Sequence, residues 1–237
     1  MSAAALRALH VPGHPLLLPN VWDADTARLV EEAGYPVVAT SSVAVAATLG
    51  YPDGEQAPAG EMFAAAARIA RAVSVPVTVD AESGYGLPAP EFVARLLDTG
   101  AVGCNLEDTD HALGRVRPIA EQADRLAAVR AAAGDALVLN ARIDLFLRAE
   151  DQRAVLPEAI ERARAYLDAG ADCVYPILVR SADVLAEFVK AVSPGAVNGN
   201  RLPDGTDLAA LGVARISLGA EPWRAARGRF ADYLAGL

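Results

Sequence analysis

The chain has 237 residues, a formal net charge of −9, 53% hydrophobic residues and 22% charged residues. The apolar fraction excludes a disordered chain, and the acidic balance argues against a nucleic-acid binder, because phosphate binding needs a basic face. No apolar run reaches the roughly 20 residues that span a bilayer, and the N-terminus lacks the apolar stretch of a signal peptide. We therefore expect a soluble, cytoplasmic protein that folds as a single domain over residues 1–237.

Short β-branched runs alternate along the chain with longer amphipathic segments. Eight strands are predicted, in chain order at residues 16–20, 37–41, 75–81, 102–107, 137–141, 173–176, 196–199 and 215–218. Apolar residues at 3.6-residue spacing predict helices at 23–33, 61–73, 89–98, 119–132, 157–169, 182–192, 207–211 and 222–234. Each predicted strand is thus followed by a helical pattern, which is short only after the seventh strand.

Eight β-then-α units in about 240 residues predict a (β/α)₈ barrel of the TIM type. The strands are mostly apolar rather than alternating, which suits a parallel sheet that is covered on both faces. A doubly wound sheet is the alternative, but no GxGxxG motif follows the first strand. The longest irregular stretches, at 46–60, 108–118 and 200–206, would all lie at the C-terminal face of the barrel, where active sites are built.

Three absences narrow the chemistry that the chain can carry out. The only lysine, Lys190, lies in a predicted surface helix, so a Schiff-base aldolase, which needs a lysine in a buried site, is not expected. Cys104 and Cys173 lie in apolar runs and are expected to be buried thiols rather than a disulfide. The three histidines show no zinc-ligand spacing. Carbon–carbon chemistry would therefore have to use another kind of metal site.

Polar side chains gather at the predicted C-terminal ends of the strands, which a barrel brings into one ring. Asp80 and Glu82 lie at the end of the third strand and, separated by one residue, point the same way. Glu107 ends the next strand, so three carboxylates converge into an oxygen-rich site that suits Mg²⁺, or Mn²⁺. Arg142, one strand further round, is a fork suited to a carboxylate or phosphate. This set predicts a divalent cation and a small anionic carboxylate substrate.

Six segments together resemble a known family, the isocitrate lyase / phosphoenolpyruvate mutase superfamily, over nearly the whole chain. They are Asn20-Val21-Trp22-Asp23-Ala24, Thr40-Ser41-Ser42-Val43-Ala44, Leu49-Gly50-Tyr51-Pro52-Asp53, Asp80-Ala81-Glu82-Ser83-Gly84-Tyr85-Gly86, Asn105-Leu106-Glu107-Asp108 and Ala141-Arg142-Ile143-Asp144. The third-strand segment is similar to the D-x-D-T-G-Y-G signature, with Glu82 in place of the second Asp and Ser83 in place of Thr.

The resemblance implies a (β/α)₈ barrel whose last helix is often exchanged between the subunits of a dimer or tetramer. It implies Mg²⁺ near the three carboxylates, bound partly through water, and an enolate intermediate, whose charge a divalent cation stabilises. It also implies site residues around the reacting centre and around the carboxylate and oxyanion of a 2-oxo acid: Asp53 for the first, and Ser41, Ser42, Val43 and Arg142 for the second.

The loop after the fourth strand departs from the best-known members of the family. It reads Glu107-Asp108-Thr109-Asp110-His111-Ala112-Leu113-Gly114-Arg115, without the K-[KR]-C-G-H stretch of the lyases or the Asn-Ser of the phosphoenolpyruvate mutases. His111 is the one side chain in this loop with a near-neutral unperturbed pKa. It is a candidate general acid or base, with a solvated loop histidine as the alternative.

Three functions remain open. The leading hypothesis is a Mg²⁺-dependent carbon–carbon lyase that cleaves a small 2-hydroxy or 2-oxo di- or tricarboxylate through a metal-stabilised enolate. The second is a phosphonopyruvate hydrolase, or a phosphonomutase of phosphoenolpyruvate or carboxyphosphonoenolpyruvate. The third is a non-catalytic barrel that binds small anions. For catalysis we expect Asp53, Arg142 and His111; for substrate binding Ser41, Ser42, Val43, Arg142 and Asn198; and for the metal Asp80, Glu82 and Glu107.

Overall fold

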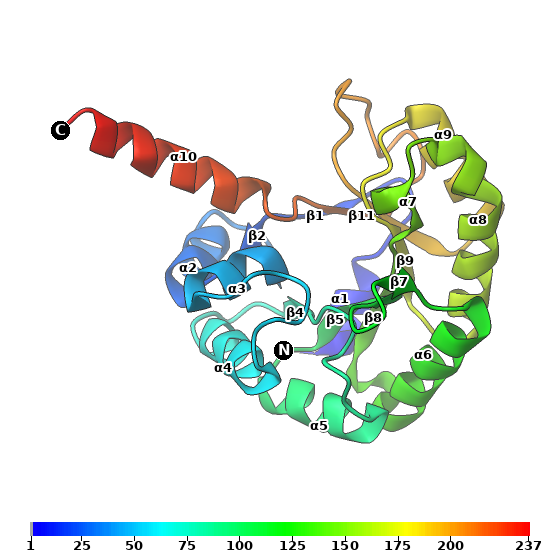
Figure 1. Cartoon of the computed structure of the whole chain (residues 1–237), viewed down its shortest axis with the longest axis horizontal. Helices are drawn as coiled ribbons and strands as arrows, with labels where there is room; N and C mark the ends of the chain where they lie inside the picture. Colours follow the sequence, from blue (N-terminus) through cyan, green and yellow to red (C-terminus); the bar gives the residue numbers. More distant parts are fainter. Residues whose placement is uncertain (1) are drawn as a thin grey trace.

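The structure, a computed structural model, describes residues 2–237, and its main feature is a nine-stranded parallel sheet in the order β1-β11-β10-β9-β8-β5-β4-β3-β2 (Figure 1). These strands are β1 (Leu16–Leu18), β2 (Asn20–Val21), β3 (Val38–Thr40), β4 (Val77–Asp80), β5 (Gly103–Glu107), β8 (Val138–Ile143), β9 (Cys173–Pro176), β10 (Ala196–Gly199) and β11 (Arg215–Ser217). A separate antiparallel hairpin, β6 (Thr109–Asp110) and β7 (Arg115–Val116), follows β5.

The sheet closes into a barrel through its first strand. β1 and β2 are two halves of one predicted strand, separated by Pro19, whose ring removes a backbone N–H from the ladder. β1 pairs with β11 on one side, and β2 pairs with β3 on the other. Counted as one broken strand, they leave eight positions around the ring. The predicted (β/α)₈ barrel is thereby confirmed.

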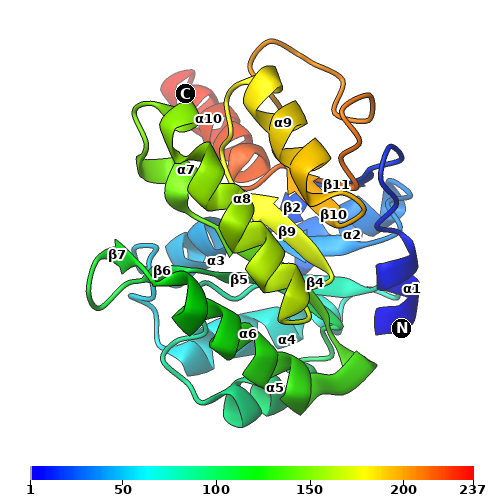
Figure 2. The same ribbon diagram turned by 90° about the vertical axis from the view of Figure 1, so that its right-hand side faces the viewer.

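Helices surround the barrel, as Figures 1 and 2 show. They are α1 (Ala3–Ala8), α2 (Ala24–Glu32), α3 (Ser42–Leu49), α4 (Ala59–Ala70), α5 (Ala89–Asp98), α6 (Ile119–Ala133), α7 (Leu145–Arg148), α8 (Gln152–Asp168), α9 (Ala182–Val192) and α10 (Glu221–Ala235). The short α1 lies at the N-terminal end of the barrel. Its Leu6 is fully buried, and a Cβ atom on Gly103 of β5 would come within 2.7 Å of the Leu6 side chain.

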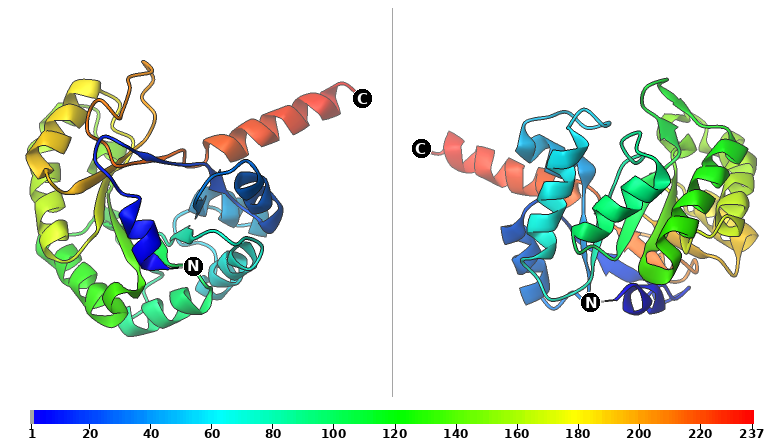
Figure 3. Two further views of the ribbon diagram at one scale, coloured as in Figure 1. Left: turned by 180° about the vertical axis from the view of Figure 1, so that it is seen from behind. Right: turned by 90° about the horizontal axis from the view of Figure 1, so that it is seen from below.

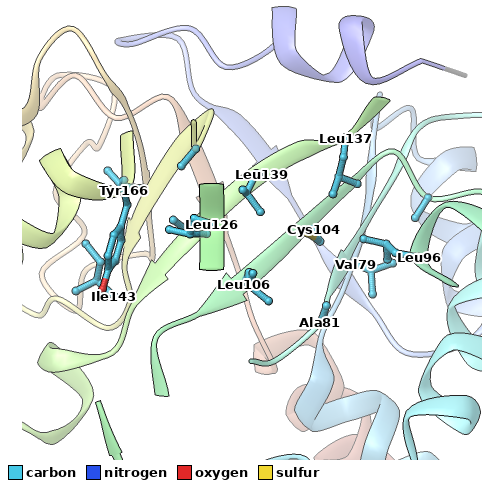
Figure 4. Close-up of a cluster of buried hydrophobic side chains, with 14 of the residues drawn as sticks. Val79, Ala81, Leu96, Cys104, Leu106, Leu126, Leu137, Leu139, Ile143 and Tyr166 are labelled. Atoms are coloured by element: carbon cyan, nitrogen blue, oxygen red, sulfur yellow. The ribbon is translucent and has the colours of Figure 1, made fainter. Parts of the chain in front are cut away.

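The core lies between the sheet and the outer helices. Figure 4 shows part of it, where Leu106 and Leu139 of neighbouring strands lie near Leu126 of α6, and Val79 lies beside Leu96 of α5. Cys104, also in this cluster, is buried, and both cysteines are free, as predicted. The apolar strands therefore bury their side chains on both faces, which is what a parallel sheet inside a shell of helices requires.

Several predicted elements need correction. The helix predicted at 207–211 is wrong, because β10 and β11 are joined by turns. The helix predicted at 157–169 begins earlier, at Gln152, where the Asp151 carboxylate accepts hydrogen bonds from the next backbone N–H groups. Helix α3 was not predicted, and its second half lies in the stretch 46–60 that was expected to be irregular. Its residues are almost all apolar, so it shows no helical contrast between faces.

Helix α10 projects from the barrel (Figures 1 and 3). None of its residues is buried, and Phe230, Tyr233 and Leu234 are each more than half exposed. Residues 2–237 contain no helix with the length and apolar character needed to cross a membrane.

Candidate active site

The C-terminal ends of the strands surround a cavity of about 270 Å³. Six of the predicted site residues line it: Ser41, Ser42, Val43, Asp53, Asp80 and Arg142. They come from the first turn of α3 and the residue before it, from the ends of β4 and β8, and from the loop after α3. Glu82, Glu107, His111 and Asn198 do not line the cavity. The ring of strand ends thus brings together most, but not all, of the side chains that the sequence pointed to.

Asp80, the last residue of β4, is held by the start of α3. Its Oδ2 accepts hydrogen bonds from the Ser42 backbone N–H (3.1 Å) and the Ser42 hydroxyl (2.8 Å). A helix N-terminus favours a negative charge, so the segment that begins at Ser42 stabilises the carboxylate. The other oxygen, Oδ1, is buried and has no hydrogen-bond partner within residues 2–237. One oxygen of Asp80 is therefore fixed and the other is available to a ligand.

Glu82 is buried beside Asp80, at the crossing of two loops. Its backbone is left-handed (φ +48°), and its Oε1 accepts hydrogen bonds from the backbone N–H groups of Gly54 (2.9 Å) and Glu55 (2.6 Å). Glu55 in turn accepts from the Ser83 hydroxyl (2.7 Å). Burial, with the nearby carboxylates of Asp53 and Asp80, raises the pKa of Glu82 to about 7. These reciprocal contacts lock the loop after α3 onto the loop after β4.

Arg142 is held by two carboxylates that leave one of its nitrogens facing the cavity. Its Nε and Nη2 donate to the two oxygens of Asp144, at 2.6 and 2.9 Å, and its Nη2 also pairs with Glu107. Its Nη1 lies 3.9 Å from Asp80 Oδ1. Because the guanidinium is planar and donates in fixed directions, these contacts fix its orientation. Two N–H bonds of Nη1 are then left for a ligand.

Asp144 is itself anchored to the outer shell of helices. Its backbone N–H donates to Asp108 Oδ1 (2.9 Å), and Asp108 Oδ2 accepts from the hydroxyl of Tyr166 (2.9 Å) and from Arg162 (3.3 Å), both on α8. Asp108 and Asp144 are 0% and 1% exposed, so neither contacts solvent. This buried chain of hydrogen bonds connects α8 to Arg142. Sequence analysis left both aspartates without a role.

His111 lies in the loop of the β6–β7 hairpin and contacts Glu107 rather than the cavity. Its Nε2 is 2.5 Å from Glu107 Oε1. Burial raises the pKa of Glu107 to about 7, and the hydrogen bond to Glu107 raises the pKa of His111. The placement makes His111 a partner of a buried carboxylate, and its role as a general acid or base stays a prediction.

Asn198 lies deeper in the barrel than expected. It is fully buried, and its Nδ2 donates to Ser217 Oγ (3.0 Å). Asn200, two residues later on the same side of the chain, lines the cavity instead. Its Nδ2 donates to the Tyr175 hydroxyl (2.7 Å) and the Ser217 carbonyl (2.9 Å). The pattern of alternating side chains identified the correct face of this strand but not the level of the cavity along it.

The sequence analysis assigned no site role to several further lining residues, among them Asn105, Tyr175, Ser217 and Arg224. Asn105 and Tyr175 are inside β5 and β9, and Ser217 ends β11. The rule that located Asp80, that polar residues near strand ends face the site, also applies to these three. Arg224 comes from the first turns of α10, and only the packing of that helix beside the cavity reveals it.

The donor set fits a hydrated divalent cation better than a closed metal centre. Within residues 2–237, no group of three His, Cys, Asp or Glu side chains is placed to hold a metal. Yet Asp80 Oδ1 and Glu82 Oε2 are buried oxygens that lack partners, a costly arrangement for carboxylates. Mg²⁺ prefers oxygen and usually keeps several of its waters. Asp80 and Glu82 therefore fit such an ion, whereas Glu107 is occupied by Arg142 and His111.

A family model described as phosphoenolpyruvate phosphomutase matches residues 6–237. The chain belongs to this family. The chain is 31% identical over 229 residues to oxaloacetate decarboxylase from Rhodopseudomonas palustris, and the matched region covers 92% of the chain and 77% of that protein. It is 30% identical over 186 residues to 2-methylisocitrate lyase from Bacillus subtilis, at 75% and 60% coverage.

Among solved structures, a Burkholderia cenocepacia protein assigned provisionally as a phosphonomutase has a TM-score of 0.93, with 42% sequence identity and 99% coverage of both chains. The resemblance to the isocitrate lyase / phosphoenolpyruvate mutase superfamily is thus confirmed. Members of the phosphoenolpyruvate phosphomutase family similar to this chain include lyases and mutases, so this family member is an enzyme.

Proposed function

We propose that the protein is a Mg²⁺-dependent carbon–carbon lyase that cleaves a small 2-hydroxy or 2-oxo di- or tricarboxylate through an enolate. The observation that carries this proposal is the pairing, in one cavity, of Asp80 Oδ1, which accepts no hydrogen bond within residues 2–237, with Arg142 Nη1, 3.9 Å away. Asp80 would bind a cation that the substrate also chelates. Arg142 would pair with the negative charge of the substrate itself.

The cation would be held by Asp80 and, partly through water, by Glu82. When bound there, it supplies positive charge for the oxygen on which negative charge develops as the carbon–carbon bond breaks. Arg142 binds a carboxylate of the substrate through its Nη1. Val43, in the first turn of α3, lines the same cavity, and the free backbone N–H groups at a helix N-terminus favour an oxyanion.

A second arginine in the cavity supports a substrate with a second acidic group. Arg224 lines the cavity, and within residues 2–237 no carboxylate forms an ion pair with this arginine. Tyr175 also faces the cavity; burial raises the pKa of its phenol, so the group stays protonated and donates a hydrogen bond. A cavity of about 270 Å³ that presents two arginines suits a small diacid rather than a nucleotide.

Calorimetric binding of oxalate, with Mg²⁺ and with EDTA, tests the proposal. Oxalate resembles the planar enolate of pyruvate, so an enolate-forming site should bind it more tightly than it binds a substrate. We expect binding that needs Mg²⁺ and is lost in Arg142→Ala, while a screen of small diacids detects the pyruvate-type product. Folded protein that does not bind oxalate in the presence of Mg²⁺ would refute the enolate site and leave the barrel as an anion binder without this chemistry.

Phosphonate chemistry is the second candidate, favoured by the 42% identity to the Burkholderia cenocepacia protein. The same arginines and the same cation would suit a phosphonate, which carries more negative charge than a carboxylate. The two candidates give different products. Phosphate released from phosphonopyruvate, or phosphoenolpyruvate formed from it, would establish this second function in place of the lyase.

We also propose that the protein is a homodimer or homotetramer in which α10 packs against a second copy. The exposed side chains of Phe230, Tyr233 and Leu234 support this proposal, since an isolated projecting helix leaves them in water. The first turns of α10 also contribute Arg224 to the cavity. Packing of this helix against a second copy would therefore steady one wall of the site.

A further inference from the structure

A charged side chain without a countercharge lies inside the barrel. Arg215, in β11, is 1% exposed, and no carboxylate within residues 2–237 lies within salt-bridge distance of it. Burial lowers its pKa, and its Nη1 is buried without a hydrogen-bond partner. A buried, unpaired guanidinium costs stability. Arg215 does not line the cavity, so its effect on a ligand would act through the groups that it contacts.

Those groups are two side chains of the cavity wall. The Nη2 of Arg215 donates to Asn105 Oδ1 (3.1 Å), and its Nε donates to Ser217 Oγ (3.3 Å). Asn105 and Ser217 both line the cavity. In the sheet, Asn105 is the register partner of Asp80 on one side and of Asn140 on the other. Arg215 therefore lies directly behind the wall that also carries Asp80.

The contact with Arg215 decides which end of the Asn105 amide faces the cavity. A guanidinium only donates, so the group that it meets must be the oxygen of Asn105. Asn140 Nδ2 donates to the same oxygen (2.8 Å). With the oxygen held by two donors, Nδ2 points away from them, and within residues 2–237 it donates to no protein atom. Asn105 thus offers an N–H₂ group to the cavity.

Ser217 is turned into a donor in the same way. A hydroxyl has two acceptor positions and one hydrogen. Both acceptor positions are taken, one by Arg215 Nε and the other by Asn198 Nδ2 (3.0 Å). The hydroxyl hydrogen remains for a ligand. The deeply buried Asn198 thereby has a place in the same network, although it does not reach the cavity itself.

We propose that Arg215 is a positioning residue that sets Asn105 and Ser217 as hydrogen-bond donors, so that the inner wall of the cavity is a subsite for a group that only accepts, such as a substrate carboxylate. This inference rests on the proposed function, because it assumes that the cavity takes an anionic substrate. It adds a substrate-class rule: the group bound at the inner wall is a carboxylate or another oxyanion, not an amide or an amine.

Calorimetric titration with oxalate in the presence of Mg²⁺ tests the donors. Asn105→Ala and Ser217→Ala should each weaken oxalate binding by about 10-fold or more, the value of one hydrogen bond to a charged group. Asn105→Asp keeps an oxygen against Arg215, so the melting temperature should not fall, but it replaces the donor with an acceptor. It should weaken binding more than Asn105→Ala. Binding by Asn105→Asp within threefold of the wild-type protein would overturn the proposal.

The role of Arg215 is separated from a direct effect of its charge by combining variants. Arg215→Met should weaken oxalate binding in the wild-type background and have no further effect in Asn105→Ala/Ser217→Ala, while Arg215→Lys recovers part of the affinity. If Arg215→Met weakens oxalate binding as much in that double-variant background as in the wild-type background, the positioning role would be overturned. If Arg215→Met does not fold, the comparison of Asn105→Asp with Asn105→Ala still decides the proposal.

Side-chain amide signals distinguish a failure of this inference from a failure of the proposed function. The N–H₂ pair of Asn105 in a ¹⁵N NMR spectrum is identified by its loss in Asn105→Ala. We expect oxalate with Mg²⁺ to shift this pair. Oxalate that binds without shifting it would overturn the subsite and leave the proposed function intact. Wild-type protein that does not bind oxalate would refute the proposed function, and with it the subsite.

Discussion

Asp144→Asn tests whether a residue that never touches the ligand controls the site through Arg142. The carboxylate of Asp144 accepts from Arg142 at both of its oxygens, and its Oδ2 also accepts from the Thr109 hydroxyl. An asparagine of the same shape would place its oxygen where two donors meet, at the Oδ2 position. Its N–H₂ group would then face the Nε–H of Arg142, donor against donor.

The magnitude follows from the bond that is lost. One charge-assisted hydrogen bond in a buried site contributes about 1.5–3 kcal/mol. Glu107 still holds Nη2 in the variant, so the guanidinium stays but is free to turn. If the whole of this free energy is lost from oxalate binding, the affinity falls by about 10- to 150-fold. The free energy of unfolding should fall by a similar 1.5–3 kcal/mol.

Calorimetry with oxalate and Mg²⁺, together with chemical denaturation, measures both quantities. Asp172→Asn is the matched control. Like Asp144, Asp172 holds a guanidinium, and it pairs with two of them, with Arg7 Nε at 2.6 Å and Arg130 Nη2 at 2.5 Å, but it precedes β9 and so lies at the opposite end of the barrel. The Asp172→Asn variant should therefore be less stable than the wild-type protein but bind oxalate with the same affinity. Equal affinity in Asp144→Asn and the wild-type protein, or equal losses in both variants, would refute the reasoning.

Three further predictions concern the metal, the arginine and the last helix. Burial raises the pKa of Glu82 from 4.5 to about 7. Between these values the folded metal-free protein holds a proton that the unfolded chain releases. The free energy of unfolding of the metal-free protein should therefore fall as pH rises from about 5 to 8. Mg²⁺ needs the ionised carboxylate, so it should raise the melting temperature more at pH 8 than at pH 5.5; the reverse order in thermal shift measurements would contradict this. Arg142→Ala should reduce kcat/KM by at least two orders of magnitude on whichever diacid proves to be the substrate, and steady-state rates near those of the wild-type protein would remove the arginine from the site. Deletion of residues 221–237 should convert the oligomer to a monomer in light scattering, whereas an unchanged mass would place the interface elsewhere.

The order of strands and helices could be predicted from the sequence because each element carries a local pattern. Apolar runs of strand length and amphipathic runs of helix length alternate, and this is enough for a barrel. The failures occurred where the local pattern is missing or where it is not supported by packing. Helix α3 is apolar on all sides, and the turns at 207–211 contain a short apolar periodicity without the packing of a helix.

The cavity-facing positions of Asp80 and Arg142 followed from the sequence as well, because both end a strand and the barrel gathers such ends on one face. What the sequence could not supply was the partner of each charge. Whether Arg142 meets Asp144, Glu107 or a ligand depends on distances of a few ångströms between chain segments. The sequence also does not show how far along its strand a side chain lies from the cavity. For this reason Asn198 was expected at the cavity, whereas Asn200 lies there.

The sequence by itself therefore determined the fold class, the family and the face of the barrel that carries the site, since local periodicity and strand ends are properties of neighbouring residues. Only the tertiary structure decided the hydrogen-bond network around that site. Arg215 and Asn105 are 110 positions apart, and neither is marked by its neighbours. Their contact exists because the closing strand of the barrel brings β11 across from β5, and it is this contact that turns an amide of the wall toward the cavity as a donor.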